Sequence, residues 1–310
     1  MTRTMQYQPS GILIVDKPAD TTSAKVVARV KKSLKAKKVG HAGTLDPFAT
    51  GVLICLINRA TRIARFFLQG NKKYEAVLCL GIETDTQDAT GRIISRCDEI
   101  TVSERSLQTA FKMIEGENQQ IPPIFSALKQ NGIPLYKLAR SGKPAHKPAR
   151  RVFISSVRIL EIDLPTIRFE VSCTSGTYIR TLCADIGRAL GCGGHLKELR
   201  RLQSSGFTLD KALTVTEVEK LASAGKLSEQ IIGMSKALED FPEIVADHTL
   251  AQKIRYGQTI TQADFRSGQI DRRRQRPDNF IKIVDKKDHL LAIINEQRDN
   301  CVYKYCCVLQ

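Results

Sequence analysis

The interpretation of this chain depends on a stretch of fourteen residues, Gly40-His41-Ala42-Gly43-Thr44-Leu45-Asp46-Pro47-Phe48-Ala49-Thr50-Gly51-Val52-Leu53. The stretch holds one carboxylate, Asp46, among three glycines. Glycine permits positive φ and a close approach of the backbone to a partner, and Pro47 favours an extended conformation at the residue before it. Such a loop predicts an aimed Asp46 side chain, although Asp-Pro and glycine also occur in ordinary surface turns.

The same stretch resembles motif II of the TruB family of pseudouridine synthases, which reads G-H-x-G-x-L-D-P-x-A-x-G-x-L. All nine fixed positions of that fourteen-residue pattern match in register. A match of this length is far more specific than a lone Leu-Asp-Pro, although a motif still needs its structural context. The resemblance implies that Asp46 is the catalytic aspartate of an RNA-modifying enzyme.

Composition points to a nucleic-acid partner. The chain has 310 residues, enough for one large or two ordinary domains, and a hydrophobic content of 42%, typical of a globular protein. Its 48 basic and 32 acidic residues give a net charge of +16, more than solubility requires. The cations form three clusters that favour phosphate contact: Lys25, Arg29, Lys31, Lys32, Lys35, Lys37 and Lys38; Lys137, Arg140, Lys143, Lys147, Arg150 and Arg151; and Arg272, Arg273, Arg274 and Arg276.

Other compositional features exclude several classes of protein. The nine cysteines are scattered without CxxC pairs, which favours reduced thiols and a cytoplasmic location. The five histidines show no metal-ligand spacing, so we expect no metal. No secretory signal is visible at the N-terminus, and the best apolar run, residues 52–57, is too short to span a bilayer.

Periodicity predicts alternating strands and helices. We expect strands at 12–15, 74–80, 153–162 and 167–173, an edge of the core at 199–203, and helices at 23–36 with Ser23 as cap, at 103–115 and at 178–190. A Thr216-x-x-Glu219 capping box should begin a further helix. Residues 121–152 hold five prolines, two glycines and many cations, and are expected to form a mobile excursion with little core pattern.

Beyond Phe241-Pro242 the chain becomes short and β-rich, with strands expected at 280–284 and 290–294. The resemblance implies an α+β fold, in which a mixed sheet with flanking helices forms the catalytic domain and a small PUA-like RNA-binding domain ends the chain. We expect the catalytic domain at residues 1–240, with a thumb insertion at about 121–152, and the PUA-like domain at 241–310.

Pseudouridine formation breaks the N1–C1′ bond of a uridine, turns the uracil and rejoins it through C5. This isomerisation requires no cofactor, but it needs an ionised carboxylate, a pocket for the detached base and extrusion of the nucleotide from its stack. A neighbouring arginine would lower the pKa of the carboxylate by about 1–3 units. Gly176-Thr177-Tyr178-Ile179-Arg180 resembles the family's G-T-Y-I-R motif, in which the arginine pairs with the catalytic aspartate.

The resemblance also implies the residues that bind the substrate. Tyr74, in Lys72-Lys73-Tyr74, matches the tyrosine that stacks on the target uracil and takes part in proton transfer; aromatic stacking contributes about 1–3 kcal/mol per base. Tyr178 would line the same pocket, and Leu199 would give the base an apolar wall, although Leu199 alone could equally be core. His41 would enter the RNA loop, where a structural hydrogen bond is the alternative role.

Two further matches concern loops. Asp16-Lys17-Pro18 matches the family's D-K-P motif, which supports the active-site loop. The pattern from Gly81 to Gly91, with Thr84, Asp85, Thr86 and Asp88, also matches the family. Its carboxylates lack the spacing of a calcium-binding EF-hand loop, so we interpret it as a structured turn.

The resemblance therefore implies a monomeric tRNA pseudouridine synthase acting on the T-loop uridine at position 55. Two alternatives stay open. One is a related synthase of the dyskerin type, which works with guide RNA on other RNAs; the thumb insertion argues against it. The other is a non-catalytic RNA-binding or RNA-folding module, against which the set of Asp46, Tyr74 and Arg180 argues.

Overall fold

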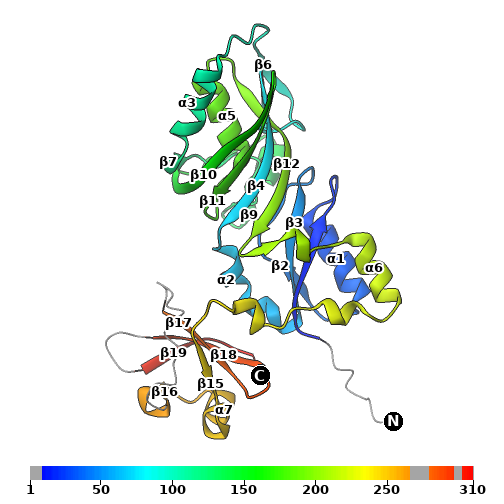
Figure 1. The fold of residues 1–310 in the computed structure, drawn as a ribbon, viewed down its shortest axis with the longest axis vertical. Coiled ribbons are helices and arrows are strands. Elements are labelled where there is room, and N and C mark those ends of the chain that lie inside the picture. Colours follow the sequence, from blue (N-terminus) through cyan, green and yellow to red (C-terminus); the bar gives the residue numbers. More distant parts are fainter. Residues whose placement is uncertain (1–8, 266–278, 297–301, 310) are drawn as a thin grey trace.

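The computed structural model describes residues 9–265, 279–296 and 302–309. Within them, a ten-stranded mixed sheet with flanking helices forms the larger part of the molecule, and a five-stranded sheet forms the C-terminal part (Figure 1). This arrangement confirms the expected α+β class.

The large sheet follows the strand order β14-β1-β3-β12-β4-β11-β10-β7, with β2 paired to β3 and β13 paired to β12. Only β1–β14 and β3–β12 are parallel among these neighbours. The strands are β1 (Gly11–Lys17), β2 (Val39–His41), β3 (Thr50–Ile57), β4 (Lys72–Leu80), β7 (Gly116–Gln120), β10 (Arg150–Asp163), β11 (Thr166–Cys173), β12 (Gly194–Ser204), β13 (Phe207–Thr208) and β14 (Leu213–Thr214). Its helices are α1 (Ser23–Ser33), α2 (Ala64–Leu68), α3 (Glu104–Met113), α5 (Ile179–Ala189) and α6 (Val215–Ser223).

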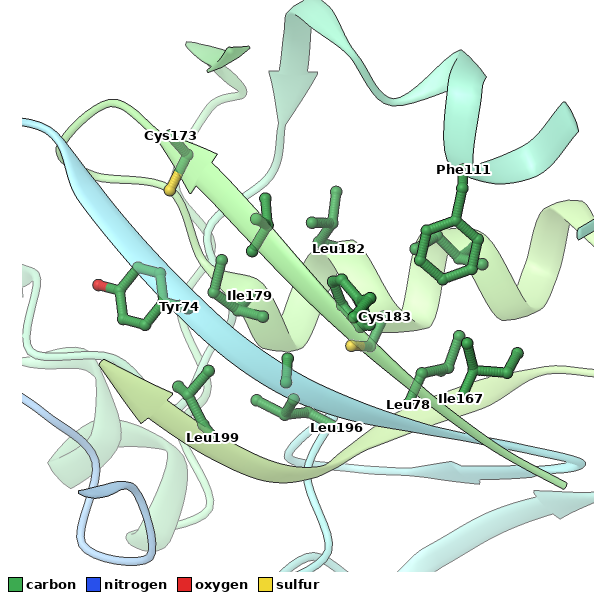
Figure 2. Close-up of a cluster of buried hydrophobic side chains, with 14 of the residues drawn as sticks. Tyr74, Leu78, Phe111, Ile167, Cys173, Ile179, Leu182, Cys183, Leu196 and Leu199 are labelled. Atoms are coloured by element: carbon green, nitrogen blue, oxygen red, sulfur yellow. The ribbon is translucent and has the colours of Figure 1, made fainter. Parts of the chain in front are cut away.

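Helices α3 and α5 cover the half of the sheet formed by β4, β11 and β12 (Figure 1). Apolar residues recur along α5 at helical spacing, so Ile179, Leu182 and Ile186 all face this core. Phe111 of α3 packs edge-to-face on Phe169 of β11, with ring centroids 5.1 Å apart. Figure 2 shows this cluster, and Tyr74 lies at one end of it with its hydroxyl directed outward.

Helices α1 and α6 cover the other half of the sheet, where they pack on β1 and β3 (Figure 1). Val26 and Val30 form the buried stripe of α1, as its apolar spacing predicts. Arg29, from the first basic cluster, pairs with Glu219 of α6 at 2.8 Å and is therefore engaged within the protein.

The C-terminal sheet has the order β15-β17-β18-β19-β16 and carries one helix, α7 (His248–Arg255). Its strands are β15 (Glu243–Val245), β16 (Ile260–Thr261), β17 (Phe280–Val284), β18 (Leu290–Glu296) and β19 (Val302–Val308), which confirms the two strands expected here. The sheet docks on the region of α2, because Phe66 packs against Phe241 and Phe280 with centroids 5.2 and 5.1 Å away.

Two sequence expectations, both about helix caps, were wrong in detail. Thr22, not Ser23, caps α1, because its side chain accepts the Lys25 N–H, while the Ser23 hydroxyl binds Leu45 instead. The capping box of α6 is formed by Thr214 and Glu217, two residues earlier than expected. Residues 199–203 belong to strand β12, which lies between β3 and β4 inside the sheet.

The proposed thumb has more structure than its composition predicts. It contains β8 (Lys129–Gln130), β9 (Ile133–Pro134) and α4 (Leu135–Arg140), and the Leu135 side chain is fully buried. A smaller hairpin, β5 (Ile82–Thr84) with β6 (Ile93–Arg96), holds the turn that follows Gly81. The expected domain limits, 1–240 and 241–310, stay a prediction.

The third basic cluster, Arg272, Arg273, Arg274 and Arg276, lies outside the described residues. In the described part of the chain, no helix combines the length and the apolar character needed to cross a membrane.

Candidate active site

The loop that carries Asp46 joins β2 to β3 and is fixed on both sides of the carboxylate. The Ser23 hydroxyl accepts the Leu45 N–H at 2.9 Å and donates to the Leu45 carbonyl at 3.1 Å. The Lys17 ammonium, which is fully buried, donates to the Pro47 carbonyl at 3.0 Å. Because both neighbours of Asp46 are held, its side chain has a defined direction, as the sequence predicts.

Gly51 explains why this loop requires glycine. Its φ is +105°, and a Cβ there would lie 2.2 Å from the Arg201 carbonyl oxygen of β12. Such a contact is sterically impossible, so any other residue would push β12 away from the loop. The close pairing of β3 with β12 therefore fixes the position at which the loop ends.

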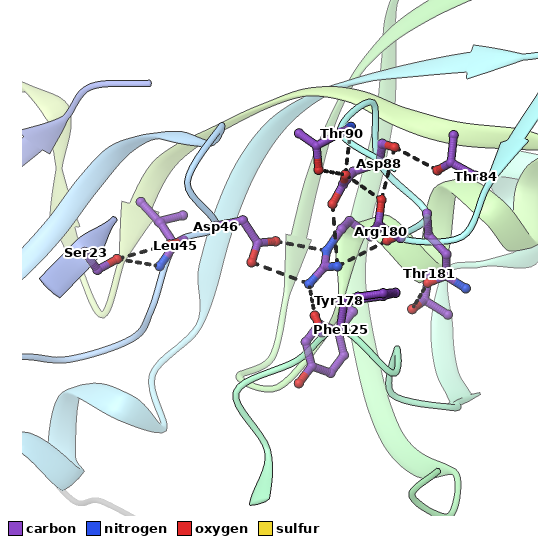
Figure 3. Close-up of polar contacts among 12 residues, drawn as sticks. Ser23, Leu45, Asp46, Thr84, Asp88, Thr90, Phe125, Tyr178, Arg180 and Thr181 are labelled. Carbon is purple, nitrogen blue, oxygen red and sulfur yellow. Dashed lines mark hydrogen bonds and ion pairs between the residues drawn. The ribbon is translucent and has the colours of Figure 1, made fainter. Parts of the chain in front are cut away.

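Asp46 and Arg180 form an ion pair across the site (Figure 3). The Arg180 Nε lies 2.9 Å from Asp46 Oδ2, and Nη2 donates to Oδ1 at 3.4 Å. The Arg180 side chain is 5% exposed and that of Asp46 is 34% exposed, so the carboxylate is reachable from solvent while the guanidinium is enclosed. The structure thus brings together the two residues that the sequence placed in separate motifs.

Asp88 is a member of this site that the sequence interpretation missed. Its Oδ2 lies 3.5 Å from Arg180 Nη1, on the other side of the guanidinium from Asp46 (Figure 3). Its Oδ1 accepts hydrogen bonds from Thr86 Oγ1 at 2.8 Å, Thr90 N at 3.0 Å and Thr90 Oγ1 at 2.6 Å. The sequence predicted the structured turn but not the contact of Asp88 with Arg180. The signal that could have indicated it was a carboxylate within a motif that matches the family.

Burial raises the pKa of the Asp46 carboxyl above its ordinary value, and the charge of Asp88 adds to this rise. Arg180 and Lys17 oppose the rise. Arg180 lowers the pKa of Asp46, as expected, but the loss of water around the carboxylate outweighs the attraction of the cations, so the net shift is upward. The exposed third of the side chain keeps some water in contact with it, which moderates the shift.

The neighbouring Lys17 responds to burial in the opposite direction. Burial lowers the pKa of its ammonium to about 8, while the charges of Asp46 and Asp20 oppose this change. Its hydrogen-bond acceptors are the carbonyls of Pro18, Thr21 and Pro47. Lys17 therefore joins the end of β1 to the Asp46 loop, as its place in the matched motif predicts.

Tyr74 and Leu199 belong to the same buried cluster as Leu45, which is next to Asp46 in the chain. Tyr74 lies on β4 and Leu199 on the adjacent β12 (Figure 2). Burial raises the pKa of the Tyr74 hydroxyl, the nearby Arg201 opposes the rise, and Asp46 adds to it.

Tyr178 lies at the N-terminus of α5, two residues before Arg180, and is half-buried. Its backbone N–H donates to Gln120 Oε1 at 2.7 Å, and its carbonyl accepts from Gln120 Nε2 at 3.0 Å. The Arg150 guanidinium covers its ring, 4.7 Å from the centroid. Gln120, which precedes the thumb, and Arg150, near its end, therefore both contact Tyr178.

His41 ends β2 and is half-buried at the start of the Asp46 loop. Burial lowers the pKa of its imidazole, and the charge of Arg201 lowers it further. Its Nδ1 is buried and has no hydrogen-bond partner among the described residues. The structural hydrogen bond that was the alternative role for His41 is therefore not made at this nitrogen.

The described residues contain no cluster of three or more histidine, cysteine, aspartate or glutamate side chains suited to a metal ion. The polar partners of Asp88 are instead hydroxyls, a backbone N–H and Arg180.

The chain is similar in sequence to known proteins. The sequence matches the model of the TruB family pseudouridylate synthase N-terminal domain over residues 31–179, and that of the tRNA pseudouridylate synthase B C-terminal domain over residues 180–239. It is 42% identical to tRNA pseudouridine synthase B of Geobacter sulfurreducens, covering 83% of this chain and 85% of that protein. It is 43% identical to the protein of the same name from Syntrophotalea carbinolica, covering 84% and 85%.

The fold also resembles chains in solved structures of complexes. It aligns with a chain in the crystal structure of a Cbf5-Nop10-Gar1 complex with a TM-score of 0.72 and 27% identity, covering 97% of this chain and 85% of that one. A chain from an H/ACA RNP bound to a substrate RNA containing 2′-deoxyuridine gives a TM-score of 0.70 and 25% identity, covering 97% and 85%. The fold and the sequence matches thus define a pseudouridine synthase with a PUA-like C-terminal unit. The chain belongs to the TruB family of pseudouridylate synthases.

Proposed function

We propose that this protein converts the T-loop uridine at position 55 of tRNA to pseudouridine, with Asp46 as the catalytic carboxylate. The observation that carries the proposal is the placement of Asp46. Its two chain neighbours are anchored by Ser23 and Lys17, and its carboxylate lies 2.9 Å from a buried arginine. A carboxylate held this firmly next to an enclosed cation is suited to act at one defined atom of a substrate.

The reaction is an isomerisation whose atoms balance without a co-reactant. The N1–C1′ bond breaks, the C5–C1′ bond forms, the proton on C5 leaves, and N1 takes up a proton. Burial makes Asp46 more basic than an ordinary carboxylate, while Arg180 and Lys17 favour its ionised form. Such a carboxylate is suited to three routes: it can attack C1′, attack the uracil ring, or remove the proton on C2′.

The flipped uracil would be held between Tyr74 and the apolar wall of Leu199, with Tyr178 lining the pocket. Tyr74 and Leu199 lie on neighbouring strands of one cluster, and the Tyr74 hydroxyl points out of it (Figure 2). His41 would enter the RNA loop, where its unpartnered Nδ1 gains an acceptor or donor. The substrate would be tRNA, whose T arm would be contacted by the basic clusters. The protein would act as a monomer.

The test is to incubate the purified protein with a prefolded, unmodified tRNA transcript labelled with tritium at C5 of uridine. Release of one tritium per tRNA, together with mapping of pseudouridine to position 55, is the expected result. A transcript with cytidine at position 55 is the matched control and should release no tritium. Activity that appears only when a guide RNA is added would favour the dyskerin-type alternative, and tRNA binding without tritium release would favour a non-catalytic module.

A further inference from the structure

Arg201 is the largest of the side chains that are almost fully buried in the described part of the chain, with 1% exposure. It lies on β12 where this strand pairs with Gly51 of β3 on one side and Tyr74 of β4 on the other. No carboxylate within the described residues forms an ion pair with it. Because a buried charge is costly unless its hydrogen bonds are made, its position requires an explanation.

The guanidinium of Arg201 joins the two ends of the Asp46 loop. Its Nε donates to the Val52 carbonyl at 2.7 Å, and its Nη2 donates to the Gly43 carbonyl at 3.1 Å. Gly43 precedes Asp46 and Val52 follows it, so one rigid fork closes the loop at its base. The two carbonyl acceptors are uncharged, so they do not neutralise the positive charge of the guanidinium as a carboxylate in an ion pair would.

The same guanidinium faces Tyr74. Arg201 and Tyr74 are opposed residues of the antiparallel pair β12–β4, so their side chains lie on one face of the sheet. Arg201 counteracts the rise that burial causes in the pKa of the Tyr74 hydroxyl, whereas Cys173 of β11 and Asp46 add to that rise. Arg201 therefore lies between the loop that carries the carboxylate and the ring expected to stack on the uracil.

We propose that Arg201 is a positioning residue of the reaction, which sets the distance between the Asp46 carboxylate and the Tyr74 hydroxyl by holding the loop ends and facing the ring at once. The inference rests on the function proposed above. It adds a residue that touches neither the substrate nor the reacting atoms and acts through two that do. A displacement of about 1 Å at such a residue can lower a rate by about 10²-fold.

The experiment compares Arg201→Met with the wild type. Methionine keeps an unbranched apolar stem but lacks both donors, so the loop ends lose their common anchor. We expect a single-turnover rate about 10²-fold lower at saturating enzyme, with tRNA affinity within about threefold of the wild type. A wild-type rate, or a rate loss explained entirely by weaker tRNA binding, would overturn the proposal.

Arg200→Met is the matched control. Arg200 is the adjacent residue of β12. Its guanidinium pairs with Asp16 at 2.7 Å and donates to Thr50 Oγ1 at 3.2 Å, so it contacts one end of the loop only and does not join Gly43 to Val52. We expect this variant to keep a rate within about threefold of the wild type. A loss as large as that of Arg201→Met would show that any arginine on this strand matters equally, and the proposal would then fail.

A double-mutant cycle with Tyr74→Phe separates positioning from general support of the fold. Phenylalanine retains the ring and removes the hydroxyl. If Arg201 acts partly through that hydroxyl, Arg201→Met lowers the rate less in the Tyr74→Phe background than in the wild type. Full additivity of the two losses would overturn the assignment of Tyr74 as a residue that Arg201 positions.

Arg201→Lys covers the case in which the methionine variant does not fold. Lysine keeps the charge, but its single ammonium cannot reproduce the two-pronged contact with both carbonyls. We expect a rate about 10-fold lower at unchanged tRNA affinity, and a wild-type rate would contradict the proposal. Absence of pseudouridine with the wild-type protein would instead reject the proposed function itself, so the two failures are distinguishable.

Discussion

Asp88 and Asp46 lie on opposite sides of one arginine: Asp46 Oδ2 is 2.9 Å from the Nε of Arg180, and Asp88 Oδ2 is 3.5 Å from its Nη1. The remaining donors of this guanidinium reach the carbonyls of Thr86 at 3.2 Å and Phe125 at 3.0 Å. The arginine therefore connects the Asp46 loop, the turn after β5 and the first part of the thumb. Its orientation depends on all three.

Replacing Asp46 with Asn should abolish pseudouridine formation and leave the fold intact. Asparagine has nearly the same shape, and the loop is held by Ser23 and Lys17 rather than by the carboxylate. We expect a loss of at least about 10⁴-fold in single-turnover rate, as for other essential catalytic groups. Tritium release measures the rate, and thermal unfolding checks the fold. Appreciable turnover would mean that another group performs the chemistry.

Arg180→Met should lose most of the activity while retaining tRNA binding. Asp46 acts when ionised, so the rate falls as pH drops through its pKa. Without the cation, burial and Asp88 are opposed only by Lys17, and the pKa of Asp46 rises further. The acidic limb of the rate profile should therefore move to higher pH. Equal losses of binding and rate would instead assign Arg180 to the RNA backbone.

Asp88→Asn should move the same limb in the opposite direction. The charge of Asp88 raises the pKa of Asp46, so its removal lowers that pKa and extends activity to lower pH. At neutral pH we expect a rate about 10-fold to 10²-fold lower, because Arg180 loses a charged partner that orients it. A pH profile measured at saturating enzyme checks both effects. An unchanged profile would show that Asp88 only stabilises its own turn.

The residues that sequence reasoning found are those whose local pattern is specific. Asp46, Arg180 and Lys17 stand in motifs in which glycine, proline and polar residues restrict the backbone, and the structure brings all three together. Apolar residues at strand or helix spacing likewise predicted the bounds of β4, β11 and α5 closely. These features are local, so the sequence records them directly.

Arg201 could not be found in the same way. In the sequence Leu199-Arg200-Arg201, nothing indicates that Arg201 is buried whereas Arg200 is partly exposed and forms an ion pair. That difference arises from the pairing of β12 with both β3 and β4, which are distant in sequence. The dominant effect of burial on the pKa of Asp46 could not be foreseen for a similar reason, because burial is a property of the assembled fold.

Activity should persist in excess chelator. The isomerisation balances without a Lewis acid, and Arg180 with Lys17 supplies the positive charge near Asp46. The assay requires tRNA that is folded beforehand and remains folded, because Mg²⁺ also stabilises the RNA. We expect single-turnover rates with and without chelator to agree within about twofold. A strict requirement for a divalent ion with such RNA would contradict the proposed chemistry.

The lysines of the thumb should affect binding more than chemistry. Lys137 and Lys143 are exposed and Lys147 is half-buried, whereas Arg150 covers the Tyr178 ring and is therefore unsuitable for this test. If the three lysines contact phosphates, the slope of log affinity against log salt should flatten by about 2 to 3 units in their triple alanine variant. Single-turnover rates at saturating enzyme should change little.

The control for this experiment removes the same charge elsewhere. Lys211, Lys220 and Lys226 are exposed on and around α6, so their triple alanine variant has an equal net charge without altering the thumb. It should keep a salt slope within about one unit of the wild type. Titration of tRNA at several salt concentrations measures both variants. If the thumb variant and the control gave superimposable slopes, the thumb lysines would be a solvated face, and the RNA would dock on another surface.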